Sequence, residues 1–326
     1  MNIIKNKRGF EFSFGWLFAI IIGSAAIFIA FYFASDMLNL LKKQENTIVG
    51  KQFDILLYPA GTGLEEDKIT LISFPVATKL FFECIPSGDF GEQRIKTSVS
   101  STMGAKYQED AINSRSSDKY IFSQTPLEGK EFLAFVKPFN MPFKVTDLIF
   151  IIQKGAQYCI VLAPDALAED IEKLKEQNNL NSTFFLAETY ETCPKASRKL
   201  CFASSRDKRC EIQVIGDKII MGDKSFYYDS NLEDNSLLYG ALFAAPEIYE
   251  CQLKRLLKRA SELSLLYLNK GASLSSTGCT SGLEQDLMQY SNTLKAINNT
   301  PSDLNNIFTM SKEIGRKNND LSCPLF

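Results

Sequence analysis

The chain has 326 residues, of which 45% are hydrophobic, and its formal net charge is −2. A chain of this length can bury a substantial core, and a nearly neutral sequence without basic runs excludes a typical nucleic-acid-binding protein. Histidine is absent, which excludes Ser-His-Asp and Cys-His catalysis and any metal site with an imidazole ligand. Acid–base catalysis would have to use carboxylates, Lys, Tyr or Cys.

An uncharged run extends from Phe14 to Ala34 near the N-terminus. With a rise of about 1.5 Å per residue, a helix over this run spans roughly 31 Å, the thickness of the hydrocarbon core of a bilayer. We therefore predict a transmembrane helix over residues 14–35 in contact with the lipid bilayer, with the basic residues 1–13 in the cytoplasm. A cleaved secretory signal is the alternative. Its apolar core would run for about 7–15 residues, whereas here apolar residues continue beyond the small residues 23–26.

The segment Lys7-Arg8-Gly9-Phe10 precedes the apolar run. This basic pair, glycine and aromatic residue resemble the processing site of type IV pilin-like precursors, which implies cleavage near Gly9. In the bacterial pattern a glutamate follows the cut by five residues. Here Glu11 follows Gly9 by two, and Phe14 occupies the expected position. A basic segment that simply precedes the start of a helix is the interpretation we prefer.

All the cysteines follow the apolar run, and their number is even. They are Cys84, Cys159, Cys193, Cys201, Cys210, Cys251, Cys279 and Cys323. This placement indicates disulfides in an oxidising, extracytoplasmic space. A structural zinc site would require close C-x₂₋₄-C pairs, and the sequence has none. We expect disulfides, with one or two thiols left free as buried apolar groups.

Two N-x-S/T triplets begin at Asn181 and Asn298 and are candidate glycosylation sites on an exported surface. Oxygen-bearing side chains cluster in 229–234, which favours a hard cation such as calcium, although the glycine and distal glutamate of an EF-hand are missing. Calcium near Asp229 is the one cofactor that the sequence suggests. The same acidic residues would also suit the positive end of a helix that begins at Ser236.

The apolar helix is expected to continue for two or three turns as a stalk and to stop at Gly50. Beyond it, β-branched, aromatic and apolar runs predict strands. They are separated by turns at Phe74-Pro75 and Pro86-Ser87-Gly88 and by a polar loop at 101–118, and one of them ends at Pro138. The strands are expected at 69–74, 79–84, 94–100, 132–136, 148–152 and 158–162.

A helix is predicted over 165–177, with Asp165 as its N-cap, and a strand over 182–187 follows it. Together with the strand that precedes the helix, they form a β-α-β unit, for which parallel pairing is the default. Further short strands with Gly-Asp turns predict a small antiparallel subsheet. These strands are expected at 200–203, 210–215, 218–221 and 225–228.

Apolar residues repeat at a spacing of three and four in three stretches of the last third, which predicts three antiparallel helices. Pro246 suits the first position of the first helix, and Gly271 its end. This arrangement brings Cys279 and Cys323 to one pole, so we predict a disulfide between them. Four basic residues of the first helix, Lys254, Arg255, Lys258 and Arg259, form a face that is either solvated or in contact with an anionic membrane or glycan.

The predicted fold class is α+β: a mixed sheet with one β-α-β unit and a small antiparallel subsheet, then a C-terminal three-helix region, preceded by a single N-terminal transmembrane helix. The predicted organisation is a cytoplasmic N-terminus (1–13), a transmembrane helix (14–35), a stalk (36–53), an extracytoplasmic mixed α/β domain (54–230) and a helical C-terminal region (231–326).

The sequence favours a single-pass protein of the cell membrane whose main domain lies outside the cytoplasm and binds or assembles with a protein partner at the cell surface. A Ser116-x-x-Lys119 spacing is compatible with acyl transfer, but a polar loop predicts a charged, solvated lysine. We single out no catalytic, cofactor-binding or metal-ligating residue. The alternatives are an extracytoplasmic hydrolase that uses carboxylates and a type IV pilin-like subunit processed near Gly9.

Overall fold

The computed structural model describes residues 14–56, 68–99, 112–227, 235–276, 278–296 and 304–326. By its internal contacts, the chain divides into two compact units, 1–48 and 49–326. Helix α1 (Phe14–Leu56) contains a segment, Phe14–Met37, that is long and apolar enough to cross a membrane. The helix does not stop at Gly50 as expected, because a single glycine inside a helix costs only about 1 kcal/mol.

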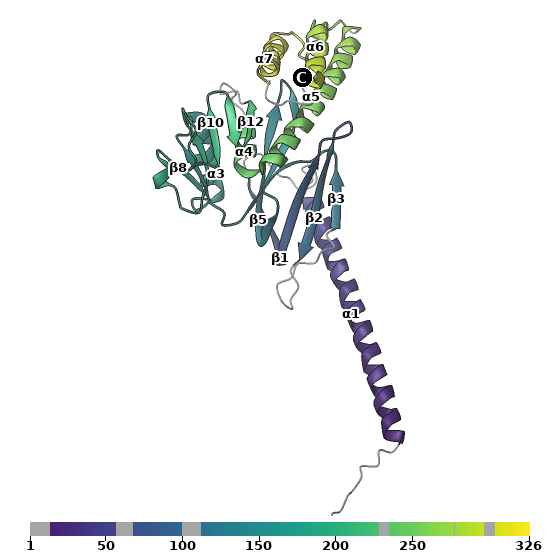
Figure 1. The fold of residues 1–326 in the computed structure, drawn as a ribbon. Helices are drawn as coiled ribbons and strands as arrows, with labels where there is room; N and C mark the ends of the chain where they lie inside the picture. The colour runs from purple at the N-terminus through teal and green to yellow at the C-terminus, as the bar shows by residue number, and fades with distance from the viewer. Residues whose placement is uncertain (1–13, 57–67, 100–111, 228–234, 277, 297–303) are drawn as a thin grey trace, which may run out of the picture. The chain divides into compact units, whose positions relative to one another are not determined.

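The first sheet has six strands in the order β3-β2-β1-β5-β6-β4 (Figure 1). All neighbours are antiparallel except β4 and β6, which pair in parallel. The strands are β1 (Thr70–Ile85), β2 (Glu92–Val99), β3 (Ile112–Ser116), β4 (Tyr120–Phe122), β5 (Leu127–Asn140) and β6 (Lys144–Gln153).

Two prolines lie inside these strands, where the sequence predicted a turn and the end of a strand. Pro75 lies within β1 at a point where the register against β5 shifts, between Ser73 and Thr78. Pro138 lies within β5, opposite Asp147 of β6. The predicted turn at Phe74-Pro75 and the predicted strand end at Pro138 are wrong. Pro75 lies at an irregular point of its ladder, and Pro138 lies beyond Ala134, the last β5 residue paired with β1. At both places a residue that has no N–H to donate is tolerated. The expected polar loop at 101–118 also contains a strand, β3.

The second sheet has the order β12-β11-β10-β9-β7-β8. Strands β8, β7, β9 and β10 are parallel, and β11 and β12 continue the sheet in antiparallel fashion. The β-α-β unit and both Gly-Asp hairpins are thus confirmed. The separate antiparallel subsheet is wrong, because β9 and β10 pair in parallel and β9 joins them to β7 in one sheet. Helix α3 begins at Asp165 with Pro164 in the N-cap position, so the predicted N-cap is wrong by one residue. The elements are β7 (Tyr158–Val161), α3 (Asp165–Asn178), β8 (Phe184–Ala187), η1 (Tyr190–Thr192), β9 (Arg198–Phe202), β10 (Ile212–Ile215), β11 (Lys218–Met221) and β12 (Lys224–Tyr227).

The last third is helical, as predicted, and the residues of its apolar seams are largely buried. The helices are α4 (Ser236–Phe243), α5 (Pro246–Ser275), α6 (Glu284–Ala296) and α7 (Asn305–Asn319). Helix α5 begins at Pro246 as expected but continues past Gly271. Gly271 lies inside the helix, beside the C-terminal segment: a Cβ there would lie 3.4 Å from the Leu325 side chain, at ordinary contact distance.

Helix α4 lies in the main core and contacts strands of both sheets. Each of its eight residues is buried, as expected for a helix that is apolar on all sides. At Gly240 a Cβ would lie 2.8 Å from the Phe122 ring of β4, so a larger residue could not approach the first sheet as closely. Helix α5 crosses the same sheet and contacts β1, β4 and β6 (Figure 1).

Both faces of the first sheet bury apolar side chains. In β5, Leu133 and Phe135 belong to the main core under α4 and α5, whereas Phe132 and Ala134 belong to a second cluster. Because successive residues of a strand point to opposite faces, this second cluster lies on the other face of the sheet. The near-continuous apolar runs of β5 and β6 follow from this two-sided burial.

Candidate functional site

All eight cysteines are paired, and the described residues include no free thiol. The pairs are Cys84–Cys251, Cys159–Cys193, Cys201–Cys210 and Cys279–Cys323, with Cα atoms 5.8 to 6.3 Å apart. The expectation of one or two free thiols is therefore wrong. The bond between Cys279 and Cys323 is the one that the three-helix arrangement predicts. Four disulfides on one side of an apolar helix indicate an oxidising, extracytoplasmic environment.

Two of these disulfides cover one face of the second sheet. In β7, Tyr158 and Ile160 face the main core, whereas Cys159 and Val161 belong to a separate small cluster. That cluster also contains Cys193, Cys201 and Cys210. Helix α3 contributes its apolar residues to the main core only, so disulfide-linked loops occupy the place that a second helical layer has in many parallel sheets.

The basic face of α5 contacts the first sheet. The buried Arg255 guanidinium donates to the backbone carbonyls of Phe90, Ser117 and Lys119 at 2.8 to 3.1 Å, and burial lowers the pKa of this guanidinium. Arg259 donates to the carbonyl of Val145 at 2.8 Å. The prediction of a solvated or surface-binding basic face is wrong at these two arginines, because strand and turn carbonyls bind them.

The Ser-x-x-Lys spacing forms a local turn. Ser116 donates from its Oγ to the Asp118 carboxylate and accepts the backbone N–H of Lys119 at 3.2 Å. Lys119 is buried rather than solvated as the polar sequence predicted. Its carbonyl binds Arg255, and the arrangement serves to hold this turn against α5.

A second buried charge links the two sheets through α3 and α4. The Lys137 ammonium in β5 lies 2.6 Å from the Asp170 carboxylate in α3, and their side chains are 9% and 21% exposed. Tyr239 of α4 donates its hydroxyl to the other Asp170 oxygen at 2.9 Å. A buried, paired charge whose carboxylate accepts a second hydrogen bond suits a structural junction.

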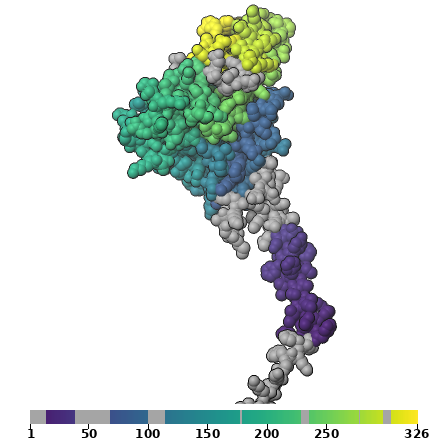
Figure 2. Space-filling view, in the orientation of Figure 1, coloured from purple at the N-terminus to yellow at the C-terminus, as the bar shows by residue number. Residues whose placement is uncertain are grey.

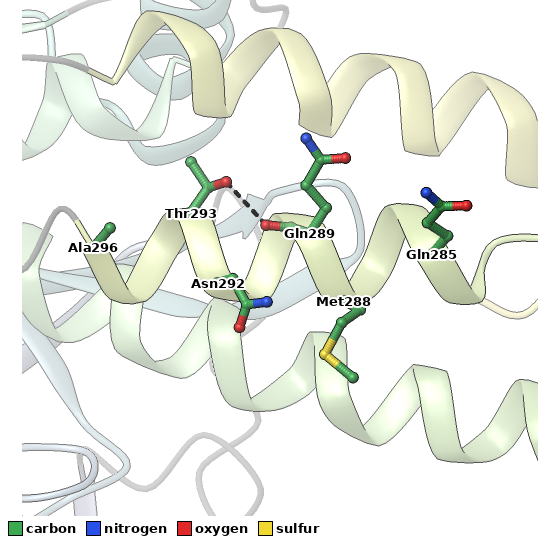
Figure 3. A pocket seen from close by; sticks show the side chains of 6 residues that line it. All are labelled: Gln285, Met288, Gln289, Asn292, Thr293 and Ala296. Carbon is green, nitrogen blue, oxygen red and sulfur yellow. Dashed lines mark hydrogen bonds between the residues drawn. The ribbon is translucent and has the colours of Figure 1, made fainter.

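The outward face of α6 is the candidate binding surface, which we call the α6 face. A shallow, open hollow of about 550 Å³ lies along it, and Figure 3 shows its side chains along one helix. The residues are Gln285, Met288, Gln289, Asn292, Thr293 and Ala296. None is charged, and Met288 is 43% exposed. The Thr293 hydroxyl donates to the Gln289 carbonyl at 2.9 Å, so its polar group is satisfied within the helix.

The sequence patterns above do not predict this surface, although α6 carries a signal for it. The apolar seam of α6 consists of residues that are buried in the core, among them Leu287, Tyr290 and Leu294. The informative pattern lies on the opposite side of the same helix, where no charged residue occurs. In Figure 2 the C-terminal helices, coloured yellow, reach the surface at one end of their unit.

Several predicted sites lie outside the residues that the structure describes. These are the pilin-like segment around Gly9, the oxygen-rich segment 229–234 and the sequon at Asn298. Within the described ranges, no group of three or more Cys, Asp or Glu side chains is arranged to hold a metal ion. Asn181 is exposed, in the turn that joins α3 to β8.

Comparisons of the chain with protein-family models, with curated proteins and with solved structures find no match. The features that bear on function are therefore those of the chain itself, namely the α+β fold, the apolar N-terminal helix, the four disulfides and the α6 face.

Proposed function

We propose that this protein is held in the cell membrane by its N-terminal helix and acts outside the cytoplasm as a binding or assembly module. The observation that carries the proposal is the placement of the cysteines, which all follow α1 and are all paired. Disulfides form and persist in oxidising compartments. The basic residues before the apolar segment support an orientation with the N-terminus in the cytoplasm.

The α6 face supports a role in binding a protein. Charged residues are depleted and methionine is enriched at the centres of protein interfaces, and this face has Met288 exposed and no charge. The neighbouring helix α7 differs, because Arg316 pairs with Glu313 and Asp320 on its exposed surface. Among the residues that the structure describes, those that line the hollow all come from one helix, which suits an extended partner better than an enclosed small molecule.

A matched pair of variants tests this role. Thr293 on α6 and Thr309 on α7 each donate a hydroxyl to the carbonyl four residues earlier. Thr293→Lys places a charge on the α6 face, and Thr309→Lys places the same charge on the neighbouring helix. Chemical cross-linking in intact cells should give a specific adduct with the wild-type chain and the Thr309 variant, and lose it with the Thr293 variant. Equal cross-linking of all three would contradict a role for the α6 face.

No specific observation favours the alternative function, a hydrolase that uses carboxylates. A hollow of about 280 Å³ beside α5 is lined by Asp89 and Glu262, but also by Lys258 and Lys295. The Lys295 ammonium lies 3.3 Å from the Glu262 carboxylate. The Glu262 carboxylate is therefore engaged in an ion pair.

A further inference from the structure

We propose that Asn181 is an acceptor for an N-linked glycan. This inference rests on the extracytoplasmic placement proposed above, because glycan transfer of this kind modifies exported domains. Asn181, Ser182 and Thr183 form the required triplet, with serine rather than proline in the middle. The structure adds what the triplet alone does not provide, namely the surroundings of the acceptor side chain.

The acceptor lies at the tip of a turn. The Thr183 N–H donates to the Leu180 carbonyl at 2.9 Å, so Asn181 and Ser182 are the two central residues of this turn. Both are exposed. A glycan attached to the Asn181 amide would therefore extend into solvent without displacing any core residue.

The position on the second sheet gives the glycan a physical role. The turn leads directly into β8, the outermost strand beside β7 in the strand order. An edge strand presents unpaired backbone groups that can pair with another chain, and proteins commonly shield such edges. A bulky, soluble glycan at the start of β8 would obstruct this pairing.

The timing of the modification also follows from the fold. Thr183, the third residue of the triplet, is 3% exposed, and the triplet lies within the loop that the Cys159–Cys193 disulfide closes. A transferase could reach Thr183 only before this part of the sheet folds. The transfer is therefore expected on the newly translocated chain.

The reaction needs a lipid-linked glycosyl diphosphate as co-reactant. The Asn181 amide nitrogen forms a bond to C1 of the first sugar while the bond from C1 to the diphosphate oxygen breaks. The electron pair of that bond leaves with the lipid diphosphate, and the amide proton passes to a base of the transferase. No oxidant or reductant is involved.

The test uses the full chain made in the secretory pathway of cultured animal cells, with Asn298→Gln as the background so that only one natural triplet remains. Glycans are detected by a mobility shift that a peptide amidase removes. We expect one glycan in the background chain, none after adding Asn181→Gln, and one after adding Thr183→Ser, which preserves the triplet.

A reporter separates the two ways in which this test can fail. Asp223 is exposed in the turn before Lys224 and Ser225, so Asp223→Asn creates a new triplet in the same domain. Added to the chain that lacks both natural triplets, it should acquire a glycan. If the reporter is modified but Asn181 is not, the inference is overturned while the topology stands. If neither is modified, the extracytoplasmic placement fails, and the inference fails with it.

Discussion

The Arg255 guanidinium lies over the Tyr120 ring, 4.4 Å from its centroid, and both side chains are fully buried. The contact joins the middle of α5 to the first residue of β4. Gly91 leaves room for the Arg255 side chain, because a Cβ at this position would lie 2.8 Å from it. The backbone of Gly91 also has a φ of +63°, which favours glycine. A cation buried in this way stabilises the fold only while its hydrogen-bond acceptors are in place.

Replacing Arg255 with leucine should be strongly destabilising, because the carbonyls of Phe90, Ser117 and Lys119 lose their donor. We expect the free energy of unfolding to fall by about 3–5 kcal/mol. Lys258→Leu is the control on the same helix. Lys258 donates to the carbonyls of an exposed turn, so its loss should cost less than about 1 kcal/mol. Denaturant titration of the full chain in detergent measures both, and equal losses would contradict the role of Arg255.

Asp170→Asn should also be destabilising, because it leaves the Lys137 ammonium buried without its carboxylate. The expected loss in unfolding free energy is about 3 kcal/mol. Glu131→Gln is the matched control, since Glu131 pairs with Lys154 where both side chains are nearly half exposed. That variant should lose about 0–1 kcal/mol. If the two substitutions cost the same, the Lys137–Asp170 pair is not a structural junction.

The disulfides should differ in their effect on stability. In the chain-entropy model, a disulfide restricts the unfolded state more when it closes a longer loop. Cys84–Cys251 spans 167 positions and Cys201–Cys210 spans 9. Replacing each pair with serines should lower the unfolding free energy by about 5 and about 3 kcal/mol, respectively. Thermal or denaturant unfolding of the two double-serine variants shows which disulfide contributes more to stability. A larger loss without Cys201–Cys210 would show that loop length does not control the contribution.

The Asp207 carboxylate contributes to the stability of the folded chain in a pH-dependent way. Hydrogen bonds from the Arg209 side chain and backbone lower the pKa of Asp207 from 3.8 to about 2. Because the folded-state pKa is the lower one, this stabilisation is present above about pH 4 and is lost as the pH falls towards 2. Carbon NMR titration of Asp207 should show the low pKa in the wild-type chain. In an Arg209→Gln variant it should return towards its ordinary value, and an unchanged pKa there would refute the assignment.

Local patterns in the sequence predicted most of the helices and the parallel unit. Continuous apolar runs identified α1 and the strands β6 and β7, and the spacing of Tyr249, Leu253 and Leu256 identified α5. The failures have a common physical cause. Pro75 and Arg255 carry local signals for a turn and for a solvated face, but tertiary contacts with distant parts of the chain override those signals.

The candidate site was harder to predict than the fold. A binding face is defined by what remains exposed after the core forms, and exposure on α6 depends on how α5 and α7 pack against it. The lack of charge between Gln285 and Ala296 on one side of the helix becomes informative only once Leu287 and Tyr290 are known to be buried.

The central claim is that one apolar helix crosses the cytoplasmic membrane and leaves the disulfide-bonded domain outside. It is tested most directly by adding protease to cells whose cytoplasmic membrane is the only remaining barrier. If the domain lies outside, residues beyond α1 should be digested while the membrane is intact, and a fragment containing Phe14–Met37 should stay in the membrane. Digestion of the domain only after the membrane is broken would contradict it.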